Sequence, residues 1–218
     1  MTAEKNLNLW KKQLGQVPEE VWEKADLETL VLADNALAEI SEKIAHLKRL
    51  RMLDLGHNRL TKIPQSLGEI ENLSDFLYLH DNQLADLPQS LANLKKLRYL
   101  NISENKFTAL PQAVTNMTAL IELRASDNSL NALPNSIAQL THLRELHLRN
   151  NRIFTLPAEI VSLHELRQID LRGNPILMLP PEIADLPRLE KLDLRWVELP
   201  EKPEWFARLE ARGCAIYR

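Results

Sequence analysis

Residues 143–165 have the sequence Leu-Arg-Glu-Leu-His-Leu-Arg-Asn-Asn-Arg-Ile-Phe-Thr-Leu-Pro-Ala-Glu-Ile-Val-Ser-Leu-His-Glu. The same pattern, Leu-x-x-Leu-x-Leu-x-x-Asn-x-Leu-x-x-Leu-Pro-x-x-Ile-x-x-Leu, recurs along almost the whole chain, with its asparagine at positions 35, 58, 82, 105, 128, 151 and 174. Successive asparagines are 23 residues apart, with one interval of 24. A fixed period of this length predicts a solenoid, in which each repeat forms one turn and the stacked turns bury a continuous core.

The leucines and the asparagine of each repeat have different expected roles. Leucines two positions apart, such as Leu146 and Leu148, point to the same side of a short strand and are expected in the core. Strands of successive repeats are expected about 4.8 Å apart in a parallel sheet. The asparagine amide both donates and accepts hydrogen bonds, so it is expected to satisfy backbone groups where the chain leaves the strand. The seven asparagines are therefore predicted to be structural, and the proline of each repeat to begin a convex segment.

This pattern resembles that of the leucine-rich repeat family, and the resemblance covers almost the whole chain. The ending Leu-Pro-x-x-Ile-x-x-Leu is similar to that of the intracellular and bacterial branch, which includes the Ras-group scaffold proteins. The resemblance implies an α/β solenoid: a right-handed horseshoe with a parallel β-sheet on its concave face and short helical or extended segments on its convex face. It also implies a non-catalytic scaffold or adaptor that binds a protein or peptide on the concave face.

We predict a single domain over residues 1–218. It comprises an N-terminal capping unit at 1–26, seven repeats at 27–188, and a C-terminal capping repeat with a helix at 189–218. The interval of 24 residues between asparagines arises between Leu73 and Leu77, where three residues separate leucines that elsewhere have two between them. A bulge is expected there, at the start of the strand.

The two end units depart from the repeat pattern in ways that are typical of caps. Lys12 replaces the asparagine in the first unit, where Trp10 and Trp22 are expected to cover the first core layer. Val197 replaces the asparagine in the last unit. The segment that follows predicts an amphipathic helix that ends at Gly213, and then a final edge strand.

The amino-acid composition excludes several classes of function for this protein. The net charge of −3, from 27 basic and 30 acidic residues, argues against nucleic acid as a partner. No apolar run reaches membrane-spanning length, and the N-terminus lacks the apolar stretch of a signal peptide, so we predict a cytoplasmic protein without a membrane partner. A single cysteine, Cys214, fits a reducing compartment.

Motifs for catalysis or cofactor binding are absent from the sequence. There is no Gly-rich phosphate loop, no Cys-x-x-Cys pair and no His-Glu-x-x-His, so we expect no enzymatic activity, no cofactor and no metal. His57 and His80 come closest to a metal site, with Asp54 and Asp81 near them in the repeat pattern. A metal site needs three or four converging ligands, so ordinary surface histidines are the favoured interpretation.

Two groups of residues on the predicted concave face are candidates for partner binding. The first, the aromatic cluster, occupies adjacent strands and consists of Met52, Phe76, Tyr78, His80 and Tyr99. Such side chains are enriched in binding hot spots, because they bury a large area at a low entropic cost. The alternative is that they stabilise the sheet as cross-strand neighbours.

The second group, the basic column, lies toward the C-terminus and consists of Arg124, His147, Arg149, Arg172 and Arg195. Aligned guanidinium groups bind carboxylates or phosphates bidentately. The alternative is that neighbouring acids, Glu145, Asp170 and Asp193, neutralise the column. Together the two groups predict a partner with an apolar anchor for the N-terminal half and acidic groups for the C-terminal half.

Two further functions use the same surface. A self-assembling protein would pack the aromatic cluster against its own copy in a homodimer. A bacterial effector, delivered into a host to intercept signalling or ubiquitin pathways, would bind a host protein there.

Overall fold

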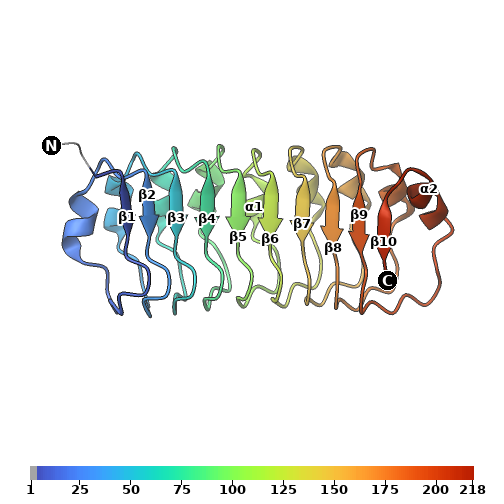
Figure 1. The fold of residues 1–218 in the computed structure, drawn as a ribbon, viewed down its shortest axis with the longest axis horizontal. Helices are drawn as coiled ribbons and strands as arrows, with labels where there is room; N and C mark the ends of the chain where they lie inside the picture. The colour runs from blue at the N-terminus through green and yellow to red at the C-terminus, as the bar shows by residue number, and fades with distance from the viewer. Residues whose placement is uncertain (1–3) are drawn as a thin grey trace.

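The computed structural model describes residues 4–218, which form a ten-stranded parallel sheet in chain order, β1 to β10 (Figure 1). Residues 1–3 of the predicted N-terminal capping unit lie outside the described residues. Each strand has three residues, as the leucine spacing predicts. Their bounds are β1 Asn6–Asn8, β2 Thr29–Val31, β3 Met52–Asp54, β4 Phe76–Tyr78, β5 Tyr99–Asn101, β6 Glu122–Arg124, β7 Glu145–His147, β8 Gln168–Asp170, β9 Lys191–Asp193 and β10 Ala215–Tyr217.

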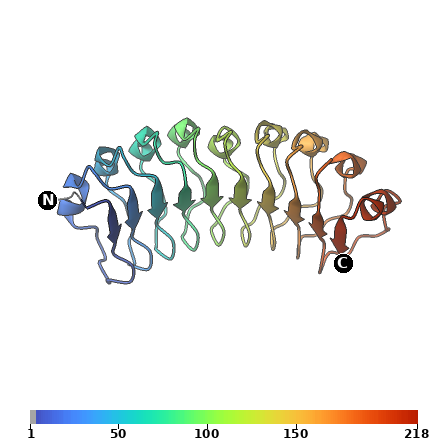
Figure 2. The same cartoon turned by 45° about the horizontal axis from the view of Figure 1, so that its top comes forward.

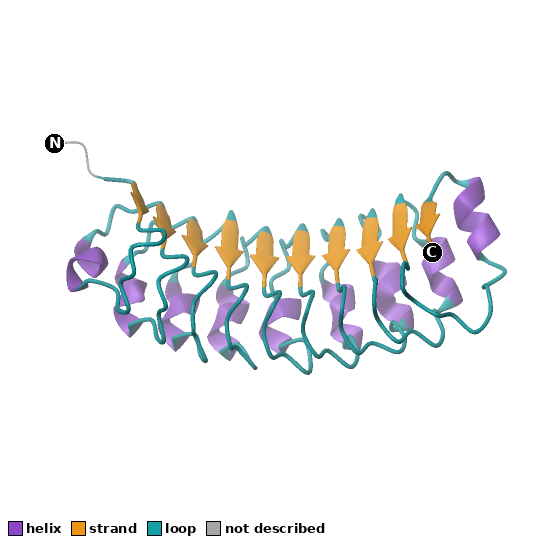
Figure 3. Ribbon diagram, turned by 60° about the horizontal axis from the view of Figure 1, so that its bottom comes forward, coloured by secondary structure: helices purple, strands orange, loops and turns teal. Residues whose placement is uncertain are grey.

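Short helices line the opposite side of the solenoid, and the sheet forms its concave face (Figures 2 and 3). Helices pack about 8–10 Å apart and strands about 4.8 Å apart, so stacking one of each per repeat curves the molecule toward the strands. Most of the helices are 3-10 turns that begin after the proline of the repeat. Their bounds are η1 Glu19–Glu23, η2 Glu42–His46, η3 Gln65–Glu69, η4 Gln89–Asn93, α1 Gln112–Thr115, η5 Asn135–Gln139, η6 Ala158–Ser162, η7 Pro181–Asp185 and α2 Phe206–Ala211.

One continuous core runs between the sheet and the helices, from Val17 to Cys214. The middle residue of each repeat strand is buried, as with Leu53 in β3 and Leu100 in β5, and the helices contribute residues such as Ile160. The predicted leucine-rich repeat solenoid is therefore the observed fold. In the part of the chain described by the structure, no helix is long and apolar enough to cross a membrane.

The asparagines form a hydrogen-bonded ladder along one side of the core. The Nδ2 group of Asn58 donates to three backbone oxygens, those of Leu32 (3.1 Å), Leu55 (3.0 Å) and Gly56 (3.0 Å). Its Oδ1 atom accepts from the backbone N–H groups of Asn35 (3.1 Å) and Leu37 (3.0 Å). These groups lie outside the strand ladder, so the predicted structural role of the asparagines is the observed one.

The residue before each asparagine has a positive φ, which closes the turn at the end of the strand. Gly173 and Asn150 suit this left-handed conformation. Trp196, which precedes Val197 in the last unit, also adopts it (φ 61°), at a steric cost. The sequence pattern did not predict this turn.

The repeat with the 24-residue interval has one extra residue. This residue lies before β4 and not within it. The N–H groups of Ser74 (3.3 Å) and Asp75 (2.9 Å) both donate to the backbone oxygen of Arg51. From Phe76 onward the register is regular, with Phe76 opposite Met52.

The two ends differ in how well they match the prediction. At the C-terminus, Phe206 and Leu209 are buried, Gly213 has a φ of +87°, and β10 pairs with β9 as expected. At the N-terminus, Trp22 is buried but Trp10 is 56% exposed, so the prediction that Trp10 covers the first core layer is wrong. Trp10 lies beyond β1, and its backbone N–H donates to Oδ1 of Asn8 (2.9 Å).

Candidate functional site

The sheet register brings the aromatic cluster together on β3, β4 and β5. Met52, Phe76 and Tyr99 occupy matching positions on these strands. Tyr78 lies next to Tyr99 on the same face. His80 follows β4 at the edge where the strands end, which is the lower edge in Figure 1. Backbone hydrogen bonds hold each of these strands on both sides. The side chains therefore project from a rigid backbone.

The rings contact one another as one surface. Phe76 lies 5.9 Å from Tyr78 and 5.4 Å from Tyr99 between ring centroids, and the two tyrosines are 5.0 Å apart. Phe76 is nonetheless 42% exposed. These contacts stabilise the sheet by about 0.5–1.5 kcal/mol per pair, and they leave part of the Phe76 ring in contact with water.

Both tyrosine hydroxyls remain protonated at neutral pH. Burial of the ring raises the pKa of Tyr99 to about 12, and burial likewise raises the pKa of Tyr78. Each hydroxyl therefore keeps a proton that it can donate to a backbone or side-chain oxygen of a partner. A surface of this kind offers apolar contact and hydrogen-bond donors together.

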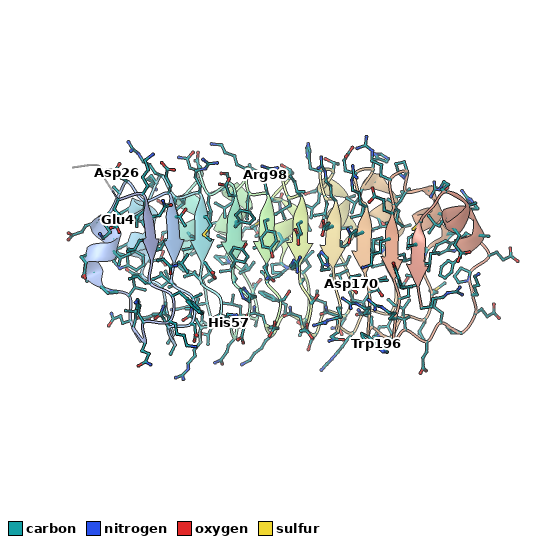
Figure 4. The ribbon with its side chains drawn as sticks, viewed as in Figure 1. Glu4, Asp26, His57, Arg98, Asp170 and Trp196 are labelled. Atoms are coloured by element: carbon teal, nitrogen blue, oxygen red, sulfur yellow. The ribbon has the colours of Figure 1, made fainter. Side chains whose placement is uncertain are left out.

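His80 lies 6.0 Å from Tyr78 and 4.6 Å from His57 between ring centroids, and Figure 4 labels His57 at the lower edge of the sheet. The two Nε2 atoms are 3.2 Å apart, and the Nδ1 atom of His57 lies 2.7 Å from the Asp81 carboxylate. A Cβ atom on Gly56 would lie 2.4 Å from the His80 ring, so the ring occupies the space that this glycine leaves free. The Asp81 carboxylate accepts from Nδ1–H of His57, and one of the two Nε2 atoms donates to the other.

The neutral form of His80 is favoured in the folded protein. Burial of the ring lowers the pKa of His80, the neighbouring His57 lowers it further, and Asp54, Glu104 and Asp81 oppose the shift. Above pH 6.5 the side chain is neutral in both the folded and the unfolded chain. As the pH falls from 6.5 toward the lowered pKa, the unfolded chain binds a proton that the folded chain does not, so the folded state loses stability.

We therefore expect the wild-type protein to lose part of its free energy of unfolding on mild acidification, and His80→Asn to lose less. The measurement is urea unfolding at a series of pH values from neutral downward. His164→Asn, a change of an exposed histidine on the convex side, should follow the wild-type curve. Parallel curves for wild type and His80→Asn would show that His80 is not the group responsible.

The arginines of the basic column are all paired with carboxylates. Arg172 and Arg195 bind Asp170 and Asp193 bidentately, with N···O distances between 2.6 and 2.9 Å. The remaining contacts are Arg124 with Glu122 (2.5 Å), Arg149 with Asp127 (2.9 Å) and His147 with Glu145 (3.1 Å). An anionic partner would have to compete with these internal carboxylates for the guanidinium groups.

Asp193 is the most buried carboxylate of this network. Burial by itself would raise the pKa of Asp193, but side-chain and backbone hydrogen bonds from Arg195 hold it below its ordinary value. Arg172 and Lys191 lie 3.7 and 3.6 Å from the same carboxylate. This carboxylate is therefore a fixed counter-charge for three cations, and it holds their side chains on the sheet.

Within residues 4–218, one group of three side chains has the ligand types and the proximity that a metal ion requires. Potential ligand atoms of Glu122, Glu145 and His147 lie within 4.8 Å of one another. Glu122 also binds Arg124, and His147 lies between the two carboxylates at 3.1 and 3.7 Å. Internal ion pairs thus account for the group without a metal.

Two features of the surface were not predicted from the sequence. The first, the exposed loop patch, lies beyond the asparagine ladder and consists of Phe154, Leu177 and Met178, the last two being 60% and 67% exposed. Their repeat positions are small or polar in the earlier repeats, such as Thr61 and Ala85, and this contrast is a signal present in the sequence.

The second feature, the edge row, consists of the residues that precede each strand at the upper edge of the sheet. It runs Lys5, Glu28, Arg51, Asp75, Arg98, Ile121, Arg144, Arg167 and Glu190. Ion pairs join its neighbours at both ends: Lys5 with Glu28 (2.7 Å), Arg51 with Asp75 (3.2 Å), and Arg167 with Glu190 (2.8 Å). Pairing stops in the middle, where Ile121 separates Arg98 from Arg144.

Several recesses lie on the surface, and one of about 230 Å³ is lined by residues of the basic column, including Arg124, His147 and Arg149. A recess of about 750 Å³ on the convex side is lined by loop and helix residues such as Ile40 and Pro64, and contains none of the predicted site residues. A groove of about 410 Å³ opens at the upper edge of the concave face. It is lined by Arg51, Asp75, Phe76, Arg98, Tyr99, Ile121 and Glu122, and so joins the aromatic cluster to the edge row.

The stacked parallel strands and the asparagine ladder define a solenoid repeat protein. Family models described as leucine rich repeat match residues 5–60, 25–84 and 75–130, and a model of a leucine-rich repeat region matches residues 133–211. The chain belongs to the leucine-rich repeat family. Among curated proteins it is 34% identical, over 74 residues, to the volume-regulated anion channel subunit LRRC8D of Rattus norvegicus; the match covers 33% of this chain and 9% of that protein.

Several solved structures share the fold. A leucine-rich repeat protein of Leptospira interrogans has a TM-score of 0.76 at 27% identity, over 96% of this chain and 65% of that one. The ectodomain of the plant receptor kinase GASSHO1/SCHENGEN3 from Arabidopsis thaliana, in complex with CASPARIAN STRIP INTEGRITY FACTOR 2, has a TM-score of 0.77 at 31% identity, over 89% of this chain and 24% of that one. The plant peptide hormone receptor RGFR1, in complex with RGF2, has a TM-score of 0.76 at 32% identity, over 91% and 35%.

The chain thus spans 65% or less of the length of each of these proteins. Because the similar structures include a bacterial protein and plant receptors, its assignment to the intracellular and bacterial branch stays a prediction.

Proposed function

We propose that this protein is a non-catalytic interaction module that binds a protein or peptide on its concave face. The observation that carries the proposal is the aromatic cluster, a connected apolar surface on three adjacent strands with Phe76 42% exposed. An exposed cluster of this size on a rigid sheet usually has a binding role. The complexes of the two similar plant receptors with their ligands agree with this class of function.

The contribution of the cluster to binding follows from its chemistry. Phe76, Tyr78 and Tyr99 lose little side-chain entropy on binding because they already pack against one another. The tyrosine hydroxyls supply donors at the periphery of the apolar area. In this proposal the basic column lies on the C-terminal side of the binding surface and sets charge complementarity, and its internal ion pairs limit its contribution to affinity.

We expect the double variant Tyr78→Ala/Tyr99→Ala to lose the partner. The experiment captures proteins on immobilised wild type from an extract of the source cells, identifies the retained protein, and then measures its affinity for each variant by calorimetry. Loss of two hot-spot side chains should weaken binding at least about tenfold.

The matched control is Leu177→Ala/Met178→Ala, which removes two exposed apolar side chains from the exposed loop patch. This control should bind like wild type, and circular dichroism should show that all variants fold. Equal affinity of the tyrosine variant and the control for the partner would reject the concave-face site. If wild type captures nothing and light scattering shows a dimer that the tyrosine variant does not form, the self-assembly alternative holds.

A further inference from the structure

The edge row places two unpaired arginines beside the groove at the upper edge of the sheet. Among residues 4–218, neither Arg98 nor Arg144 makes an ion pair, whereas the row on either side of them is paired. Figure 4 labels Arg98 at this edge, away from His57 and Trp196 at the opposite edge. Both arginine side chains are exposed.

The other charges of the groove are already balanced. Asp75 binds Arg51 at 3.2 Å, and Glu122 binds Arg124 at 2.5 Å. Arg98 is therefore the uncompensated charge in a groove whose apolar walls are Phe76, Tyr99 and Ile121. The groove is positive and apolar, so it complements an apolar side chain with a carboxylate beside it.

The distance between the two arginines determines how far apart the acidic residues of such a ligand must be. They precede strands β5 and β7, which are two strands apart, or about 10 Å across the sheet. An extended peptide rises about 3.3 Å per residue and alternates its side chains between two sides, so carboxylates two or four positions apart share one side. They span about 7 or 13 Å, and the flexible guanidinium groups can reach both. A groove of about 410 Å³ holds one large side chain between or beside them.

We propose that the groove and the two arginines bind an extended segment of the partner in which an apolar residue is accompanied by acidic residues two or four positions apart. This inference rests on the proposed function and specifies the partner's chemistry. Acidic residues of the partner would then contact Arg98 and Arg144 of the edge row, which have no internal carboxylate among the described residues. They would not contact the basic column, where each guanidinium group has one.

The test is a selection of short random peptides displayed on phage, with wild type and Arg98→Gln/Arg144→Gln as separate targets. The matched control target is Arg59→Gln/Arg152→Gln. Those two arginines also lack ion pairs to the described residues, are exposed, and each follow a ladder asparagine at the far edge, so the charge change is the same. Enriched peptides are then labelled, and their affinities are measured by fluorescence anisotropy at several salt concentrations.

We expect wild type and the control to enrich peptides with an apolar residue and acidic residues at the stated spacing. Those peptides should bind Arg98→Gln/Arg144→Gln about tenfold more weakly and with a smaller dependence on salt. Phe76→Ala, which removes one wall of the groove, should weaken the same peptides without changing the salt dependence.

Enriched peptides that lack acidic residues, or that bind Arg98→Gln/Arg144→Gln as tightly as wild type, would overturn the inference. Failure of wild type to enrich any peptide above the double variant would overturn it as well. Neither result would reject the proposed function, which depends on the loss of the captured protein by Tyr78→Ala/Tyr99→Ala.

Discussion

Replacing Phe107 with alanine is expected to lower the free energy of unfolding by about 3–5 kcal/mol. Phe107 is among the largest fully buried side chains, and it lies two positions after the ladder asparagine, where neighbouring repeats have Leu84 and Leu130. Removing the ring takes apolar area out of the core and leaves a cavity between two stacked repeats, which the rigid backbone ladder cannot close. Urea unfolding followed by circular dichroism gives the change.

Two further variants show whether burial is the cause. Phe154→Ala makes the same chemical change at a side chain that is 48% exposed, and it should cost less than about 1 kcal/mol. Phe107→Leu keeps most of the volume and matches the neighbouring repeats, so it should cost less than Phe107→Ala. An equal cost for Phe107→Ala and Phe154→Ala would contradict the packing described above.

Replacing Asn58 with alanine is expected to cost about 3 kcal/mol, because two buried backbone N–H groups lose their acceptor and three backbone oxygens lose one of two donors. The N–H groups of Asn35 and Leu37 lose their acceptor. The oxygens of Leu32, Leu55 and Gly56 each lose one donor and keep another, from Asn35 Nδ2, Asn82 Nδ2 and the Asp34 N–H group. Water has no access to these groups inside the stack, so the loss is not compensated. The concave face carries none of the changed atoms, so binding by the folded fraction should be unaffected.

Asn131→Ala is the matched control, since this exposed asparagine makes one long side-chain bond of 3.4 Å to the oxygen of Thr108. Asn58→Asp keeps the acceptor but places a carboxylate against three carbonyl oxygens, so it should be at least as damaging as Asn58→Ala. Asn58→Ala and Asn131→Ala with the same unfolding midpoint would show that the ladder is not a major source of stability.

Much of the candidate site followed from the sequence, because the sheet register follows from the repeat. Once Leu53, Leu77 and Leu100 are assigned to the core, the residues on either side of each leucine must point to the concave face. The aromatic cluster was therefore predictable as a group. The loop patch and the edge row were missed because the prediction was confined to positions flanking the strand leucines.

The sequence did not predict which acidic side chain each basic side chain pairs with. Arg124 and Arg172 bind acids two positions away on their own strands, whereas Arg149 binds Asp127 on the neighbouring repeat. Several rotamers of a long exposed side chain have similar energies, so its contacts depend on what the adjacent repeats place within reach. The unpaired state of Arg98 becomes visible only when the neighbours of each charge are known.

The sequence by itself determined the solenoid, the order and register of its strands, the buried leucines and the asparagine ladder. It could do so because one short pattern repeats, and each copy imposes the same burial and hydrogen-bond requirements. Only the tertiary structure decided that His80 lies over Gly56, that Trp10 is exposed, and that the basic column is internally paired. Those outcomes depend on contacts between repeats at positions where the pattern imposes no requirement, so the local sequence leaves them open.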